Sequence, residues 1–226
     1  FSFKIGFSKL YKIYFIFLLI CFQGFMGWYM VSSGLVERVD VSHFRLSAHL
    51  IIAFIILSLI FWNFLKINLS NNCIIKINFY LPFFFLLIIF LQILMGAFVS
   101  GMDAGTIYNS WPLMGNSYFP DDNNIINLFT FSAFSEPSIV QFFHRNLAYL
   151  ILIFYLFILY KVYKNKIIGS YNSIKIIGLI LILQIILGIL TLLYGAQIYF
   201  ASMHQICSIF LVSSCIYFLY LNSDTN

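Results

Sequence analysis

The sequence has very few charged residues. Asp, Glu, Lys and Arg make up only 8% of its 226 positions, and hydrophobic residues make up 62%. A soluble domain is normally about 25% charged. This scarcity excludes an ordinary soluble enzyme and predicts an integral membrane protein. The formal charge of +5 is compatible with nucleic acid or anionic lipid, but the positions of the charges favour plain membrane topology, and we expect no nucleic-acid partner.

Cysteine is scarce as well. The four cysteines are Cys21, Cys73, Cys207 and Cys215, and none belongs to a CxxC motif or to a Cys/His spacing typical of a metal site. We therefore expect packing residues and no disulfide. The sequence also lacks a signal peptide with a small-residue cleavage site, because its first apolar run is long enough to span a bilayer.

What the sequence does contain is six long apolar runs. Each has roughly twenty residues or more, which is enough to cross about 30 Å of hydrocarbon. Because a backbone in lipid must satisfy its own hydrogen bonds, we expect helices and not strands. Only one connection, 102–137, is long. The expected spans are 11–34, 44–66, 78–101, 138–163, 172–195 and 197–221.

The charges divide between the two sides of these spans. All nine lysines fall before or beside the first span or around the second and fourth connections, whereas three arginines and six acids fall on the other side. The positive-inside rule then places both ends of the chain in the cytoplasm and the 102–137 connection outside. The three arginines, Arg38, Arg45 and Arg145, lie where lysine is excluded, so we expect them to have partners there.

An internal repeat links the odd-numbered spans to the even-numbered ones. In the first, third and fifth spans a glutamine is followed four residues later by a glycine, and the next span returns with a histidine near its start. The unit is therefore a hairpin that occurs three times. Its members are Gln23, Gly27 and His49; Gln92, Gly96 and His144; and Gln184, Gly188 and His204.

Three histidines at matched depth point to a ligand site. A lone membrane histidine more often joins two helices by a hydrogen bond, but three in equivalent positions favour axial ligation of haem iron. Two imidazoles from facing helices of a bundle can hold one porphyrin between them. Zinc is less favoured because no cysteine or carboxylate lies at the same depth. Ionisable groups inside a span usually serve a site.

Small and cationic residues surround the histidines. Glycines line the outer halves of the odd-numbered spans, which leaves room for a flat macrocycle and equally suits close helix packing. Arg45 lies one turn before His49, and Arg145 follows His144. Either guanidinium suits a haem propionate; the alternative partner is one of the outer acids. The glycines are Gly24, Gly27, Gly34, Gly96, Gly101, Gly105, Gly188 and Gly195.

The number of histidines is odd. His144 and His204 form a pair, whereas His49 has no partner, because His43 lies in the connection before the second span and is too shallow. A missing N-terminal hairpin with its own histidine would complete two four-helix halves, and the chain begins without Met. We expect residues 1–76 to be the remnant of a first half, and residues 77–226 to be a complete second half that binds haem.

Five stretches of the sequence resemble the haem A synthase family, in the version found in alphaproteobacteria and mitochondria. The most specific is DAG-x-x-YN-x-WPLM, which no general rule of membrane proteins requires. The stretches follow the family order through nearly the whole chain. They are GFMGWYMVSSGL (24–35), RLSAHL (45–50), QILMGAFVSGMDAGTIYNSWPLMG (92–115), QFFHRNLAY (141–149) and LGILTLL…ASMHQ (187–205).

The resemblance implies oxidation of a methyl group of haem O to a formyl group, which makes haem A for a terminal cytochrome oxidase. The methyl group is hydroxylated twice and water is lost, with a haem b relaying electrons from a quinol or similar donor. His144 and His204 match the axial ligands of haem b, with Arg145 beside them. His49, with Arg45, matches the half that binds the substrate haem. The motif around Asp103, Tyr108, Asn109, Trp111 and Pro112 caps one haem edge or anchors the chain at the membrane interface.

The resemblance also sets the expected context and its limits. The family's Glu-x-x-His-Arg motif, with its catalytic carboxylate, is absent, so we expect the chain to hold haem b but to be inactive alone. Expected partners are haem O, haem O synthase, oxidase assembly factors, membrane lipid and further copies of the chain, in a bacterial inner membrane. The alternatives are a bis-histidine cytochrome b that only carries electrons, and a transporter, which the absence of a mid-span acid disfavours.

Overall fold

The structure is a computed structural model that describes residues 7–32, 41–69 and 75–223, and the side chains from residue 10 onward. Six long helices carry most of this part of the chain, and all six are long and apolar enough to cross a membrane. They are α1 (Phe7–Ser32), α2 (His43–Asn68), α3 (Tyr80–Gly101), α4 (Pro137–Lys164), α5 (Tyr171–Leu193) and α6 (Ile198–Leu221). Four short 3-10 helices are η1 (Ala104–Thr106), η2 (Ile125–Phe129), η3 (Phe131–Ser135) and η4 (Ile168–Ser170).

The six predicted spans are confirmed as helices. Most observed ends lie within a few residues of the predicted ones, and α4 begins at Pro137, where a proline costs no helical hydrogen bond. The fifth helix ends at Leu193 and not at residue 195, because Gly195 and Ala196 both adopt positive φ angles, of 64° and 57°. Left-handed backbone of this kind ends a helix.

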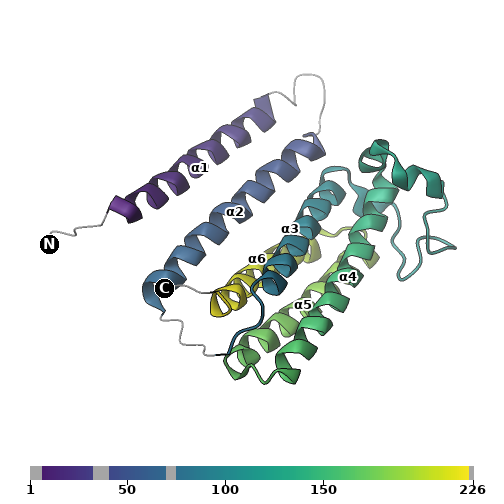
Figure 1. Ribbon diagram of the computed structural model, residues 1–226. Helices are drawn as coiled ribbons and strands as arrows, with labels where there is room; N and C mark the ends of the chain where they lie inside the picture. Colours follow the sequence, from purple (N-terminus) through teal and green to yellow (C-terminus); the bar gives the residue numbers. More distant parts are fainter. Residues whose placement is uncertain (1–6, 33–40, 70–74, 224–226) are drawn as a thin grey trace.

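Four of the helices close into a bundle. α3 packs against α4 and α6, and α5 packs against the same two helices, so α4 and α6 occupy diagonal corners. α2 packs on the outside against α3 and α6, and α1 packs against α2 (Figure 1). We call the end of the bundle that carries residues 102–136 the loop end. The opposite end, where Lys66 and Lys161 lie in the last turns of α2 and α4, is the lysine end.

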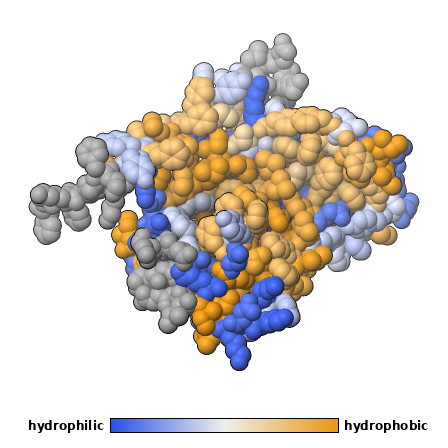
Figure 2. All heavy atoms as spheres, in the orientation of Figure 1, coloured by the Kyte–Doolittle hydropathy of each residue, from blue (hydrophilic) through white to orange (hydrophobic). Residues whose placement is uncertain are grey.

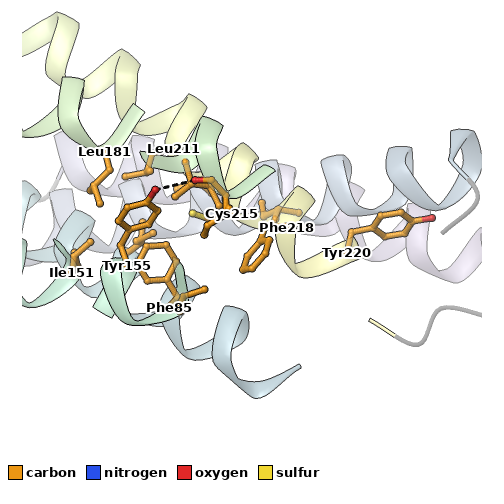
Figure 3. Packing of buried hydrophobic residues seen from close by; sticks show 14 of the residues in the cluster. Phe85, Ile151, Tyr155, Leu181, Leu211, Cys215, Phe218 and Tyr220 are labelled. Atoms are coloured by element: carbon orange, nitrogen blue, oxygen red, sulfur yellow. Dashed lines mark hydrogen bonds between the residues drawn. The ribbon is translucent and has the colours of Figure 1, made fainter. Parts of the chain in front are cut away.

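The apolar core fills the lysine half of the bundle. Phe85, Ile151, Tyr155 and Cys215 gather there from three different helices (Figure 3). Tyr155 donates a hydrogen bond of 3.1 Å to the backbone carbonyl of Ile174. Nearer the loop end the core thins to a small cluster of Met95, Phe98 and Val140. The bundle is therefore packed most densely on the side away from the three histidines.

The outer surface is as apolar as a membrane protein requires. Hydrophobic residues cover most of the face shown in Figure 2. None of the described side chains of α1 is buried, and Trp28 is 64% exposed. Cys21 also lies exposed on α1, while Cys207 and Cys215 are buried, and none of these three is in a disulfide. Cys73 and Gly34 lie outside the described residues.

Candidate functional site

The three histidines make the same contact with the preceding helix. A β-carbon added to Gly27 would lie 3.3 Å from Cε1 of His49. A β-carbon added to Gly96 would lie 3.1 Å from Cε1 of His144, and one added to Gly188 would lie 3.1 Å from Cε1 of His204. These distances are tighter than ordinary van der Waals contact, so each imidazole ring lies in the space that only glycine leaves. The repeated glycine is thus explained by a ring and not by helix packing alone.

The glutamine of each unit contacts the same histidine. The amide nitrogen of Gln23 lies 3.2 Å from Nε2 of His49 and donates to the backbone carbonyl of that histidine at 2.9 Å. Gln92 repeats both contacts with His144, at 3.4 and 3.1 Å. The glutamine therefore joins an outgoing helix to a returning one at the depth of the imidazole.

These contacts determine which imidazole nitrogen carries the proton. The backbone carbonyl of His144 can only accept, so the Gln92 atom beside it is the amide nitrogen, and Nε2 of His144 must accept from that nitrogen. In the third unit Nδ1 of His204 lies 3.0 Å from the carbonyl oxygen of Gln184, so Nδ1 is the donor. Both rings therefore present an unprotonated Nε2, the form in which imidazole binds a metal.

His144 and His204 share the interior of one bundle. They come from α4 and α6, the diagonal helices of that bundle. Nδ1 of His144 and the side-chain oxygens of Gln92 and Gln184 are buried without a hydrogen-bond partner. Unsatisfied polar atoms of this kind are uncommon in an interior. The structure thus places both imidazoles in the loop half of one bundle, where the apolar core is thin.

His49 lies in a different hairpin from that pair. It belongs to α2, and its glutamine and glycine come from α1, so its unit lies outside the four-helix bundle. Arg45 lies one turn away, with its guanidinium 4.9 Å from the ring centre of Tyr29. That distance is suitable for a cation–π contact. His43 begins α2 and packs edge-on against Phe98, at 5.3 Å between ring centres.

Arg145 binds backbone carbonyls of the loop. Its Nη1 donates to Ser110 at 2.9 Å and to Leu113 at 3.3 Å, and its Nη2 donates to Tyr108 at 2.9 Å. Gln141, one turn earlier, also donates to the Tyr108 carbonyl at 3.1 Å. The sequence suggested a propionate or an acid as the partner of Arg145, and these carbonyls are neither. Its Nε is buried and has no hydrogen-bond partner.

Further contacts hold the same loop against the bundle. Asn109 donates to the carbonyl of Leu192, at the end of α5, at 2.8 Å. The indole nitrogen of Trp111 donates to the Tyr149 hydroxyl at 3.0 Å, and the Tyr118 hydroxyl donates to Asn146 at 2.5 Å. The loop, which joins α3 to α4, is therefore hydrogen-bonded to both α4 and α5 across the loop end of the bundle. Its YN-x-W motif supplies several of the groups that make these hydrogen bonds.

Two loop residues have shifted pKa values. Hydrogen bonds from the Ser117 hydroxyl and from the Asn116 backbone lower the pKa of the Asp121 carboxyl. Desolvation, and then a hydrogen bond to Asp122, raise the pKa of the Tyr108 hydroxyl. Both shifts favour the hydrogen-bonded form of the loop.

Sequence reasoning missed two kinds of site residue. It used Gln92 and its equivalents only to align the repeat, although their amides contact the histidines. Their spacing of four residues before each glycine was the available signal. Gln141 had no role in the sequence analysis, because its partner is the backbone carbonyl of Tyr108, which a sequence pattern does not mark. Asn109 was part of the loop motif, but its partner, the backbone carbonyl of Leu192, was not predicted.

Comparisons with known proteins show the family to which the chain belongs. Residues 2–216 match the family model described as COX15-CtaA, cytochrome oxidase assembly protein. The chain is 48% identical over 213 residues to the Heme A synthase of Pelagibacter ubique (strain HTCC1062), covering 94% of this chain and 63% of that protein. It is 44% identical over 211 residues to the Heme A synthase of Rickettsia bellii (strain OSU 85-389), covering 88% and 61%. The chain thus spans less than two thirds of these relatives' length.

Proposed function

Because the chain belongs to the cytochrome oxidase assembly protein family, we propose that it forms part of a haem A synthase, an oxidoreductase that converts a methyl group of haem O to a formyl group. The similar proteins from Pelagibacter ubique and Rickettsia bellii carry the name Heme A synthase. The single observation that carries the proposal is the threefold unit in which a glutamine and a glycine hold a histidine. The unit occurs twice within one bundle.

His144 and His204 would hold the iron of a haem b. The proposal is supported by three features: both rings have an unprotonated Nε2, both lie in spaces left by glycine, and they come from diagonal helices of one bundle. A haem bound there supplies one-electron redox chemistry. The protein's part is to orient the two rings and to keep each Nδ1 protonated. The buried Nε of Arg145 remains available as a donor toward a propionate.

His49 would serve the substrate haem. Its unit repeats the geometry of the other two but belongs to the α1–α2 hairpin, outside the bundle that contains His144 and His204. Arg45, one turn from it, would pair with a substrate propionate, and its guanidinium lies 4.9 Å from the ring centre of Tyr29. This division supports a substrate site on residues 1–76 and an electron-transfer site on residues 77–226. A bacterial inner membrane with both ends of the chain in the cytoplasm agrees with the lysines at one end of the bundle.

The test separates the enzyme from a plain electron carrier. The chain is joined to the portion of the Pelagibacter ubique protein that it does not match, and the product is expressed in cells that make haem O but no haem A. Extracted pigments should then contain formyl haem, and the His49→Ala variant should yield none while keeping its haem b. A protein that binds haem b and never yields formyl haem would be a carrier, and the proposal would be wrong.

A further inference from the structure

The outer loop exposes large apolar side chains on η2 and η3. Phe129 is 88% exposed and Phe131 is 85% exposed, more than any other large hydrophobic residue in the described part of the chain. Ile125 and Ile126, at the start of η2, are also exposed. We call these four residues the Phe129 patch. Nothing in the haem chemistry proposed above uses it.

The patch belongs to a segment whose polar side chains bond within the protein and whose large apolar side chains are exposed. Asn127 donates to Asn123 at 3.1 Å, and Asn123 donates to the Ser138 hydroxyl of α4 at 2.7 Å. Ala133 of η3 is buried. The polar side chains are thus used against the protein while the large apolar ones face outward. A loop in water normally shows the reverse arrangement, because exposed apolar area is unfavourable.

One residue of the patch, Phe131, is linked through Phe134 to the loop ends of α3 and α4. The ring of Phe131 is 6.0 Å from that of Phe134, which in turn is 6.3 Å from Phe98 and 6.0 Å from Phe143. Phe98 precedes the end of α3 by a turn, and Phe143 lies about 9 Å along α4 at about 1.5 Å per residue. In Figure 2 orange residues reach the loop end at the upper right, where blue and pale residues lie among them. The patch therefore begins within two ring contacts of the membrane-spanning helices.

The negative charge of the loop indicates which kind of lipid surface the Phe129 patch contacts. Residues 102–137 contain no lysine or arginine and carry Asp103, Asp121, Asp122 and Glu136. Such a segment is repelled by anionic headgroups and gains only from apolar burial. We propose that the Phe129 patch inserts into the headgroup boundary of zwitterionic lipid at the loop end. The patch thereby anchors the outer loop in the membrane. Arg145, next to His144 in the sequence, holds the same loop through the carbonyls of Ser110 and Tyr108.

The experiment uses tryptophan as a reporter of depth. Phe129→Trp and Phe131→Trp are each reconstituted in phosphatidylcholine bilayers, and the emission of the parent chain is subtracted. The control is Asn116→Trp, at an exposed polar position in the same loop. Lipids brominated near the headgroup should quench the added emission of both patch variants at least about twofold more than that of the control. Aqueous iodide should quench the control more strongly.

Two results would overturn the proposal. Added emission that iodide quenches and brominated lipid does not would place the patch in water. Added emission that neither reagent reaches would mean that protein covers the patch. Because two positions are tested separately, failure of one variant to fold still leaves a decisive measurement.

Discussion

The substitution Gly96→Ala tests the contact between glycine and imidazole with the smallest change. The added β-carbon would lie 3.1 Å from Cε1 of His144, whereas ordinary contacts begin at 3.4 Å. The ring must therefore move by a few tenths of an ångström, against the contacts that Gln92 makes. Changes beside a metal ligand typically weaken metal affinity about 10- to 100-fold, or about 1.4 to 2.8 kcal/mol.

The same substitution should have the opposite effect on the helix itself. Alanine is about 1 kcal/mol more favourable than glycine within a helix, so the apoprotein should unfold at no lower temperature. The assay is a titration of the purified apoprotein with haem b, followed by the absorbance of the haem. Gly24→Ala is the matched control, because a β-carbon there meets nothing within 4 Å. Equal haem affinity in Gly96→Ala and in the parent chain would refute the reasoning.

Three further predictions concern packing and the loop. Gly178→Ala should lower stability by about 1–3 kcal/mol in thermal unfolding, because its β-carbon would collide with the Tyr155 hydroxyl; unchanged unfolding would contradict the packing described. Arg145→Lys should speed amide exchange around Trp111 by about tenfold or more, because an ammonium group cannot span three carbonyls; unaltered exchange would mean that other contacts hold the loop. Because the pKa of Asp121 is lowered in the folded loop, its ionised carboxylate stabilises the loop at pH values above its ordinary pKa of 3.8. This stabilisation is lost as the pH falls through the lower pKa of the folded state. Pepsin should therefore cut the loop faster at the acid end of that range, a dependence that Asp121→Ala should remove.

Sequence reasoning reached the helices and the repeat because both depend on strong, local signals. Apolar length alone defines a span, and the six predicted spans were found as six helices. The matched positions of His49, His144 and His204 followed from a fixed spacing of residue types. Their contacts with the glycines of the preceding helices were not predicted, because the glycines were interpreted as room for a macrocycle or as packing residues. The spans and the repeat themselves need no knowledge of how distant segments meet.

The hydrogen bonds that hold the loop could not be predicted from the sequence, for a physical reason. Arg145 donates to three backbone carbonyls, and every residue has a carbonyl, so no sequence pattern identifies those partners. The charge of Arg145 suggested a carboxylate instead. The outward position of Phe129 was equally hidden, because the sequence does not show which side of the long 102–137 connection faces the bundle. Tertiary structure decides both cases.

The most direct test of the central claim is the near-infrared magnetic circular dichroism of the purified chain loaded with haem b, because that spectrum identifies the axial ligands of the iron. The account predicts a bis-imidazole signal in the parent chain and in His49→Ala, and its loss in His144→Ala and in His204→Ala. A bis-imidazole signal that persists unchanged in either of the last two variants would contradict it.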